Sequence, residues 1–262
     1  MKDNNRPIGI FDSGIGGLTV VREIRKYLPG ENIIYLGDTA RVPYGNKSEE
    51  TIKKFGLQDA QFLLGFNVKL IIVACNTVSS VALDYLRERL SMVPIFGVVE
   101  PGVRIAMERS KTKKVGVIGT IATIKSEAHK RHFAKGFEVY GRPCPLFVPL
   151  AEEGITTGSI AEQVAEMYLA ELRDKVDTVI LGCTHYPLLK GVIRKVLGEA
   201  IALVDPAEEV AKEVSEFLRK EGLISSRGGT LDIFLTDIPP HYVELIERFL
   251  GERVNSVKKV EL

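Results

Sequence analysis

The sequence predicts an α/β protein with two pseudo-symmetric lobes, each a mostly parallel sheet flanked by helices, and an active site in the cleft between them. Short β-branched runs alternate along the chain with segments of helical spacing. The segment Ile8–Ser13 resembles Val115–Thr120, which lies 107 residues further on. Two cysteines in similar surroundings, Cys75 and Cys183, are 108 residues apart. We therefore expect each lobe to present one thiol to the cleft.

The first half of the chain contains four short apolar runs typical of buried parallel strands. These strands are expected at Ile8–Phe11, Ile33–Leu36, Leu70–Ala74 and Ile95–Val99. Apolar residues recur at helical spacing between the runs. The corresponding helices are expected at Leu18–Tyr27, Glu49–Leu64 and Val78–Arg89. Each helix can thus serve as the crossover that parallel strands require.

The second half repeats this alternation. Strands are expected at Val115–Ile118, Leu146–Pro149, Thr178–Leu181 and Ala202–Val204, and helices at Ser126–Lys135, Ile160–Leu172 and Leu188–Val196. A helix at Ala207–Glu221, a strand at Leu231–Leu235 and a helix at Pro240–Leu250 follow. Because the second lobe already has its βα units, we expect these last elements to return to the first. The predicted lobes are 1–97 plus 207–262, and 98–206.

Composition narrows the class of protein. The chain has 262 residues, 45% hydrophobic and 26% charged, with a net charge of +1. This balance is typical of a soluble globular protein and offers no electrostatic basis for binding nucleic acid. The polar N-terminus does not read as a signal peptide, and no apolar stretch approaches the ~20 residues that span a bilayer. Three cysteines without close spacing favour free thiols in the cytoplasm.

Cys75 and Cys183 each stand where a predicted strand ends and a helix begins. In open α/β sheets ligands bind at this edge, and amides at helix N-termini lower a thiol pKa below its usual ~8.5. We therefore expect both thiols to be reactive. Cys144 lacks this setting and is expected to be structural. His129 and His132 lie among basic residues and are expected on a solvated helix face.

Neither a zinc site nor a Walker loop is indicated, because no C-x-x-C, H-E-x-x-H or Walker motif occurs. The glycine-rich segment Asp12–Gly17 follows the first strand and could bind an anion, or form a tight turn without a ligand. A dinucleotide site, with Asp38 on the ribose, is disfavoured because Thr19 stands where the fingerprint requires glycine. Asp12 itself could assist a thiol or an ammonium group, or cap the helix. Val42–Asn46 reads as a rigid turn whose amides could bind a carboxylate.

Six motifs in this order complete the pattern. They are Phe11–Val20, Leu36–Gly45, Ala74–Thr77, Val99–Gly102, Gly119–Ile124 and Leu181–Leu189. Together they resemble the glutamate racemase family, within the aspartate/glutamate racemase superfamily. The resemblance runs from about residue 8 to residue 205, and the C-terminal segment Phe234–Pro239 departs from the family pattern.

The resemblance implies a cofactor-independent, two-base interconversion of L- and D-glutamate that supplies D-glutamate for peptidoglycan. Cys183 would remove the α-proton of L-glutamate while Cys75 protonates the opposite face. Asp12 and His185 would assist the thiols, with Glu152, or its neighbour Glu153, beside His185. The substrate-binding residues would be Asp12, Ser13, Pro43, Tyr44, Gly45, Asn76, Thr77, Thr120, Thr123, Thr184 and His185. The family also implies a homodimer.

Two alternatives remain open from the sequence. A racemase or isomerase of the same superfamily could act on aspartate, a hydantoin or a maleate-like acid. A two-lobed solute-binding protein could instead capture an acidic metabolite without chemistry, although paired thiols and the lack of an export signal argue against it.

Overall fold

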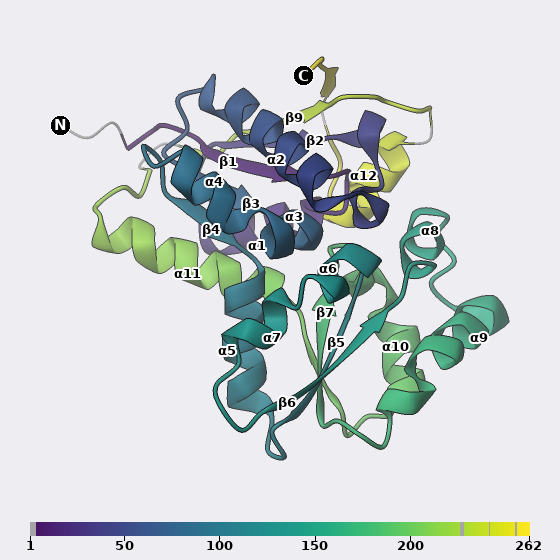
Figure 1. Ribbon diagram of the computed structural model, residues 1–262. Helices are drawn as coiled ribbons and strands as arrows, with labels where there is room; N and C mark the ends of the chain where they lie inside the picture. Colours follow the sequence, from purple (N-terminus) through teal and green to yellow (C-terminus); the bar gives the residue numbers. More distant parts are fainter. Residues whose placement is uncertain (1–3, 226–227, 241, 255) are drawn as a thin grey trace.

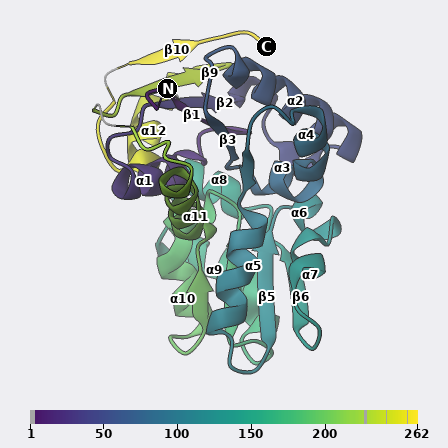
Figure 2. The same ribbon diagram turned by 90° about the vertical axis from the view of Figure 1, so that its left-hand side faces the viewer.

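Two parallel sheets organise the chain in the computed structural model, which describes residues 4–225, 228–240, 242–254 and 256–262 (Figures 1 and 2). Among these residues the larger sheet has six strands in the order β10-β9-β2-β1-β3-β4, and the smaller has four in the order β6-β5-β7-β8. Every strand pairing is parallel. The strands are β1 (Ile8–Asp12), β2 (Ile33–Gly37), β3 (Leu70–Val73), β4 (Ile95–Gly97), β5 (Lys114–Gly119), β6 (Glu138–Pro143), β7 (Thr178–Gly182), β8 (Ala202–Val204), β9 (Leu231–Leu235) and β10 (Val257–Lys259).

Helices cover both sheets, as the α/β pattern predicted. They are α1 (Leu18–Tyr27), α2 (Glu49–Leu64), α3 (Asn76–Val81), α4 (Leu83–Arg89), α5 (Val99–Arg109), α6 (Ile121–Lys125), α7 (Ala128–His132), α8 (Phe147–Glu152), α9 (Gly158–Leu169), α10 (Lys190–Leu197), α11 (Pro206–Lys220) and α12 (Tyr242–Leu250). Short 3₁₀ turns occur at η1 (Thr39–Arg41), η2 (Tyr44–Asn46), η3 (Ala170–Leu172) and η4 (Tyr186–Leu189). None of the described helices is long and apolar enough to cross a membrane.

The two sheets repeat one topology. In each, the second strand, the first, the third and the fourth lie side by side, as β2-β1-β3-β4 and as β6-β5-β7-β8. This doubly wound order reverses direction between the first and third strands, and ligands bind at the carboxyl ends of the strands at that switch point. The molecule therefore has two switch points, β1/β3 and β5/β7. The predicted fold class is confirmed.

Alternation along the strands separates two apolar layers in the larger sheet. Phe11 of β1 and Ile71 of β3 pack against the side formed by α2, α3 and α4. Ile10 of β1 and Ile72 of β3 face the side that carries α1, α11 and α12. Figure 2 shows α11 running between the two sheets, where it contacts α1 of the upper layer and α5 of the lower.

The C-terminal elements lie with the larger sheet, because β9 pairs with β2 and β10 pairs with β9. The sequence predicted the return of Leu231–Leu235 but missed β10. These pairings support the proposed lobes, 1–97 plus 207–262 and 98–206, whose boundaries stay a prediction. The expected helix at Pro240–Leu250 is described from Tyr242, and His241 lies outside the described residues.

The predicted strand at Leu146–Pro149 is wrong. Those residues begin helix α8, in which Phe147, Leu150 and Ala151 are buried at helical spacing. The sheet instead takes β6 (Glu138–Pro143), a partly exposed strand at the edge. An edge strand needs no continuous apolar run, so its sequence carries little strand signal.

Three other boundaries differ from the prediction. The single helix expected at Val78–Arg89 is interrupted at Ala82, which separates α3 from α4. The helix expected at Ser126–Lys135 is shorter and forms only α7, which begins after Glu127 with its left-handed φ of 53°, and the sequence reading missed α6 before it. The strand expected to reach Val99 ends at Gly97, and Val99 begins α5, a helix that the sequence reading missed.

Candidate active site

The two predicted thiols lie at the two switch points. Cys75 is the N-cap of α3, two residues after the end of β3. Cys183 directly follows the end of β7. Both side chains are buried and free of disulfides. The matching topology of the sheets therefore presents one cysteine from each lobe at equivalent strand ends.

Cys75 lies among oxygen atoms. Its Sγ donates to Ser13 Oγ at 3.5 Å, and Asp12 is close enough to share a side-chain hydrogen bond with the thiol. Burial, and next the negative charge of Asp12, raise the pKa of Cys75 to about 12. The expectation that helix amides lower this pKa is wrong for Cys75, because desolvation and the carboxylate outweigh them. The thiol is therefore neutral near pH 7.

Cys183 belongs to a hydrogen-bonded chain of three side chains. Its Sγ is 3.8 Å from His185 Nδ1, and His185 Nε2 is 3.0 Å from Glu152 Oε1. Burial alone lowers the pKa of His185, but hydrogen bonds and charges of Cys183 and Glu152 raise it to about 10. Helix α8 ends at Glu152 and so delivers this carboxylate, whereas Glu153 is exposed. An imidazolium beside the sulfur stabilises a thiolate at Cys183.

Asp12 lies at the end of β1, next to Cys75 and within hydrogen-bond distance of Thr184, the residue after Cys183. Its Oδ2 accepts from Gly17 N at 2.6 Å and from Thr184 Oγ1 at 3.3 Å. Its buried Oδ1 has no partner among the described residues. Burial raises the pKa of Asp12, and the charge of His185 opposes that shift. Gly17 is the N-cap of α1 and Asp12 accepts from its amide, so Asp12 holds the turn without being the cap.

The glycine-rich loop crosses to the other lobe. A Cβ at Gly16 would lie 2.4 Å from Thr184 Oγ1 and 2.5 Å from His185 Nδ1, so only glycine fits at this approach. Thr19 Oγ1 also donates to the Thr184 carbonyl at 3.3 Å. The loop thus joins the first switch point to the residues that follow Cys183.

Three threonine hydroxyls, one from the first predicted lobe and two from the second, meet at hydrogen-bond distances. Thr77 Oγ1 of α3 is 3.0 Å from Thr120 Oγ1 and 3.4 Å from Thr123 Oγ1, and the last two are 2.9 Å apart. Thr120 caps α6 by accepting from Thr123 N at 3.2 Å. Each hydroxyl has one donor and two acceptor sites, so the group retains capacity for a polar ligand. Asn76, next to Thr77, has a buried Oδ1 without a partner among the described residues.

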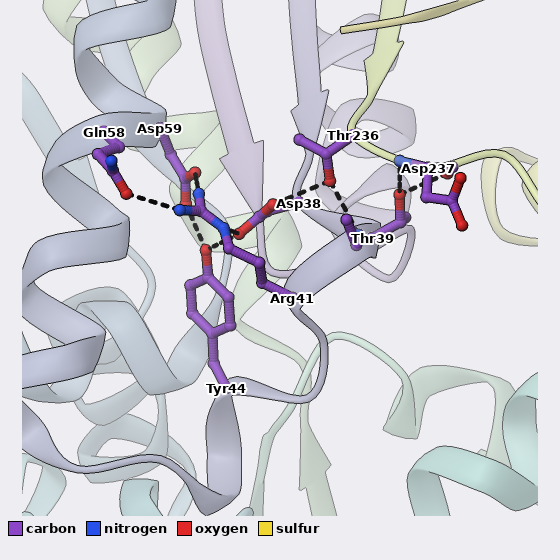
Figure 3. Close-up of polar contacts among 9 residues, drawn as sticks. Asp38, Thr39, Arg41, Tyr44, Gln58, Asp59, Thr236 and Asp237 are labelled. Atoms are coloured by element: carbon purple, nitrogen blue, oxygen red, sulfur yellow. Dashed lines mark hydrogen bonds and ion pairs between the residues drawn. The ribbon is translucent and has the colours of Figure 1, made fainter. Parts of the chain in front are cut away.

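The predicted turn at Val42–Asn46 approaches the same threonines with its backbone. A Cβ at Gly45 would lie 2.5 Å from Thr120 Cβ, so the Gly45 backbone packs directly on the opposite lobe. The Tyr44 side chain points the other way, into the first lobe, where its hydroxyl bonds Asp38 and Asp59 (Figure 3). A ligand between the lobes can therefore meet Tyr44 through its backbone and not through its hydroxyl, whereas Pro43 is exposed.

Sequence reasoning missed the buried cluster behind Tyr44. Asp38 hydrogen-bonds Arg41, Tyr44 and Thr236, so its carboxylate is engaged within the protein and does not bind the ribose of a dinucleotide. Asp59 is fully buried on α2. An aspartate on the otherwise apolar inner face of a helix is a detectable signal, because carboxylates are seldom buried without partners.

The remaining predicted residues have structural settings. Cys144 is buried, and its carbonyl accepts from Tyr186 Oη at 2.8 Å. His132 is exposed as expected, but the prediction for His129 is wrong. His129 is buried beside a cavity of about 210 Å³, and burial lowers its pKa to about 4. The helix around it is too short and too tightly packed against α5 to leave that face solvated.

No group of three or more His, Cys, Asp or Glu side chains among the described residues could hold a metal ion. The site instead brings together Asp12, Cys75, Cys183, His185 and Glu152 as one connected set of acids and bases. Such a set can remove a proton with one sulfur and deliver a proton with the other.

Comparison with known proteins gives a consistent result. Residues 8–214 match the family described as Asp/Glu/Hydantoin racemase. A glutamate racemase of Thermus thermophilus is 50% identical, covering 100% of this chain and 99% of that protein. The glutamate racemase of Geobacter metallireducens is 49% identical, covering 98% and 97%. The crystal structure of glutamate racemase from Francisella tularensis in complex with D-glutamate has a TM-score of 0.93 at 42% identity, covering 98% of each chain.

Proposed function

The chain belongs to the Asp/Glu/hydantoin racemase family and is an amino-acid racemase; we propose that it interconverts L- and D-glutamate without a cofactor, using Cys75 and Cys183 as the two bases. One observation supports this proposal above the others. The Glu152–His185–Cys183 chain and the Asp12–Cys75 pair stand at matching strand ends of two sheets of the same topology. A racemase needs such a pair, because one group must remove the α-proton while another protonates the opposite face.

In the direction from L- to D-glutamate, Cys183 is the base. The His185 imidazolium, held by Glu152, stabilises its thiolate, while the raised pKa of Cys75 keeps that thiol protonated. The C–H bond breaks as the proton moves to the Cys183 sulfur, and the electron pair remains on the α-carbon. Cys75 then gives its proton to the opposite face, which leaves a thiol at Cys183 and a thiolate at Cys75.

In the reverse direction the roles are exchanged. Cys75 must first lose its proton, and Asp12 is the group placed to accept it. The pKa of Asp12 is raised by burial, which makes this carboxylate a better proton acceptor than an ordinary aspartate. The two thiols thus have different partners, His185 for Cys183 and Asp12 for Cys75, and each thiol with its partner removes the proton from one of the two enantiomers.

The substrate would lie between the two lobes. Removing a proton α to a carboxylate builds negative charge on that carboxylate, so fixed donors around it lower the barrier. We assign this role to Ser13, the backbone of the Pro43–Gly45 turn, and the hydroxyls of Thr77, Thr120 and Thr123. Asn76 and Thr184, with Asp12 and His185, would bind the remaining carboxylate and the ammonium group.

The alternative substrates differ in length and charge. Aspartate is shorter by one methylene, and a hydantoin lacks the free ammonium and carboxylate. The three relatives above are named as glutamate racemases, and one was crystallised with D-glutamate. Glutamate is therefore the substrate we propose.

Incubation of the purified protein in D₂O with L-glutamate, L-aspartate or L-hydantoins tests the proposal. We expect loss of optical rotation and deuteration at Cα with glutamate, and a kcat/KM at least about 100-fold lower with aspartate. Absence of exchange with either glutamate enantiomer would exclude the proposed activity, and faster turnover of another substrate would select the alternative.

We further propose that the D-glutamate supplies peptidoglycan synthesis, that the enzyme acts in the cytoplasm, and that it forms a homodimer. Free thiols at Cys75, Cys144 and Cys183 support a reducing compartment. The exposed apolar side chains of Ile160 and Met167 on α9 offer a surface for self-association. Rescue of a bacterium that requires D-glutamate tests the first statement, and light scattering during gel filtration tests the dimer.

A further inference from the structure

The turn that carries Tyr44 is anchored by a buried network behind the cleft, shown in Figure 3. Tyr44 Oη hydrogen-bonds Asp38 Oδ2 and lies 3.0 Å from Asp59 Oδ2. The Arg41 guanidinium reaches both carboxyl groups, with Nε donating to Asp38 Oδ2 at 2.5 Å and Nη2 to Asp59 Oδ1 at 3.2 Å. Asp38 and Asp59 are both fully buried.

The hydrogen atoms in this network do not suffice if both aspartates are ionised. A tyrosine hydroxyl has one hydrogen and can donate it to only one carboxylate. The other contact would then bring two bare oxygens together without a proton, in a site from which water is excluded. Two buried carboxylates would also face a single guanidinium, which leaves one charge without a counterion.

We propose that Asp59 is a neutral carboxylic acid and the positioning residue of the glutamate-binding turn, which rests on the proposed function. Asp59 Oδ2–H donates to Tyr44 Oη, and Tyr44 in turn donates to the Asp38 carboxylate. The carbonyl oxygen of Asp59, Oδ1, accepts from Arg41 Nη2. With this assignment every contact has one donor and one acceptor, and Arg41 balances the single charge of Asp38.

The remaining polar groups of the network agree with this assignment. Thr236 Oγ1 donates to Asp38 Oδ1 at 2.9 Å, and Gln58 Oε1 accepts from Arg41 Nη1 at 2.6 Å. Burial, and next the charge of Asp38, raise the pKa of Asp59 well above its usual value, with a smaller contribution from Asp12. Arg41 and the Tyr44 hydroxyl act in the opposite direction but do not reverse the shift.

Asp59 acts on the cleft through Tyr44. The phenol is fixed by its two hydrogen bonds and by the Phe55 ring, whose centroid lies 5.4 Å away. The next residue, Gly45, packs its backbone on Thr120 of the opposite lobe. Loss of the hydrogen-bond donor at Asp59 should therefore move the turn that contacts substrate without touching either thiol, whereas a replacement that keeps a donor there should leave the turn in place.

The first test measures protonation without using activity. Asp59→Asn keeps the shape and supplies an N–H donor to Tyr44, but it cannot ionise. Because the folded-state pKa of Asp59 lies above the unfolded value of ~3.9, wild type loses stability relative to Asp59→Asn as pH rises. We expect the Tm of Asp59→Asn minus that of wild type to increase by about 3 °C or more between pH 4.5 and pH 8. A decrease or a constant difference would overturn the assignment.

Infrared difference spectra between wild type and Asp59→Asn at pH 8 give a second readout. The wild type should show the carbonyl stretch of a protonated carboxyl group, and loss of carboxylate bands alone would contradict the proposal. Asp84→Asn, an exposed change of the same kind on α4, is the matched control: its Tm difference from wild type should not grow between pH 4.5 and pH 8, and its difference spectrum should lack the carbonyl stretch of a protonated carboxyl group.

The positioning role is read from steady-state kinetics. Asp59→Asn should racemise glutamate with a KM within about twofold of wild type, whereas Tyr44→Phe should raise KM about tenfold with kcat changed less than threefold. Equal rises of KM in the two variants would overturn the role of Asp59 as donor. If glutamate is not turned over at all, the proposed function fails, while the melting and infrared measurements still decide the proton assignment.

Discussion

At the residue scale, the two thiols differ because their neighbours differ. Cys75 is buried beside Asp12, and that environment raises its pKa to about 12. Cys183 lies beside His185, which Glu152 holds and whose pKa is raised to about 10. The two thiols therefore have opposite kinds of neighbour, a carboxylate beside Cys75 and an imidazole held by a carboxylate beside Cys183, and the proposed mechanism uses this difference.

Removing either sulfur should abolish racemisation while the fold remains. Cys75→Ala and Cys183→Ala each take away one of the two proton-transfer groups that we propose, so we expect kcat to fall by at least about 10³-fold. Circular dichroism and Tm serve as the control for folding. Substantial residual activity in either variant would rule out the two-thiol mechanism.

Deuterium isotope effects should distinguish the roles of His185 and Asp12, the proposed partners of the two thiols. With an equilibrium constant of about one, His185→Gln must lower kcat/KM equally in both directions, by about 10²-fold for loss of an acid–base partner. Because the step at Cys183 becomes slower, the deuterium isotope effect should grow for α-deuterated L-glutamate more than for the D-enantiomer. Asp12→Asn is the matched variant and should give the opposite asymmetry. An identical pattern in the two variants would contradict the assignment of partners.

At the scale of elements, the turn η2 of the first predicted lobe packs closely against α6 of the second. Gly45→Ala would place a Cβ 2.5 Å from Thr120 Cβ and force the turn away. We expect KM for glutamate to rise about tenfold, equivalent to ~1.4 kcal/mol of binding. Gly191→Ala on α10, where the added Cβ meets nothing within 4 Å, is the control and should leave KM unchanged. An unchanged KM in Gly45→Ala would show that this contact does not shape the site.

The connection between α5 and β5 is held by Asp177. Its carboxylate accepts from Lys111 N at 2.8 Å, Thr112 N at 2.6 Å and Ser110 Oγ at 2.6 Å. Burial alone would raise the pKa of Asp177, but hydrogen bonds from Ser110, Thr112 and Thr178 lower it to about 2. A depressed folded-state pKa contributes stability above the unfolded value of ~3.9 that is lost as pH falls toward 2.

Asp177→Asn should therefore reduce the free energy of unfolding by about 2 kcal/mol at pH 7 and by less at pH 3. Denaturant titrations at the two pH values measure the difference. A loss of the same size at both pH values would mean that the charge of Asp177 does not matter.

The elements also show what the sequence could predict. Buried central strands such as β1, β3 and β7 are continuous apolar runs, so their positions were predicted within a residue. The edge strand β6 is half exposed and carries no such run, which let the apolar segment at Leu146–Pro149 be mistaken for it. Breaks such as Ala82 between α3 and α4 depend on tertiary packing and leave no clear local signal.

Some residues of the candidate site could be predicted from the sequence and others could not. Strand ends and residue types indicated both cysteines, the turns around them and His185 as a proton donor or acceptor near Cys183, while Glu152 came from the family resemblance. The buried network of Asp38, Arg41 and Asp59 was missed, because its members join only when η1, η2 and α2 fold together. Because these residues lie on separate elements, no local sequence pattern indicates that their side chains are in contact.

At the scale of the whole molecule, the shared topology of the two sheets places Cys75 and Cys183 at equivalent strand ends, as the proposed mechanism with one thiol on each face of the α-carbon requires. Each sheet has its own switch point, and Figures 1 and 2 show the larger sheet in the upper half of the molecule and the smaller in the lower half, with α11 at the level where the halves meet. Contacts between Gly16 and Thr184, and between Thr77 and Thr120, join the lobes on two sides of the cleft. Closing the lobes around substrate would exclude water and strengthen every donor there.

The fate of the α-proton during a single turnover in D₂O tests the central claim most directly. If Cys183 and Cys75 act on opposite faces, the first D-glutamate formed from L-glutamate carries deuterium at Cα, while the remaining L-glutamate carries almost none. The converse holds for the reaction that starts from D-glutamate. Mass and chirality of both pools at low conversion measure this. Product that retains the original proton, or deuterium that enters both pools at equal rates from the start, would contradict a mechanism with two bases.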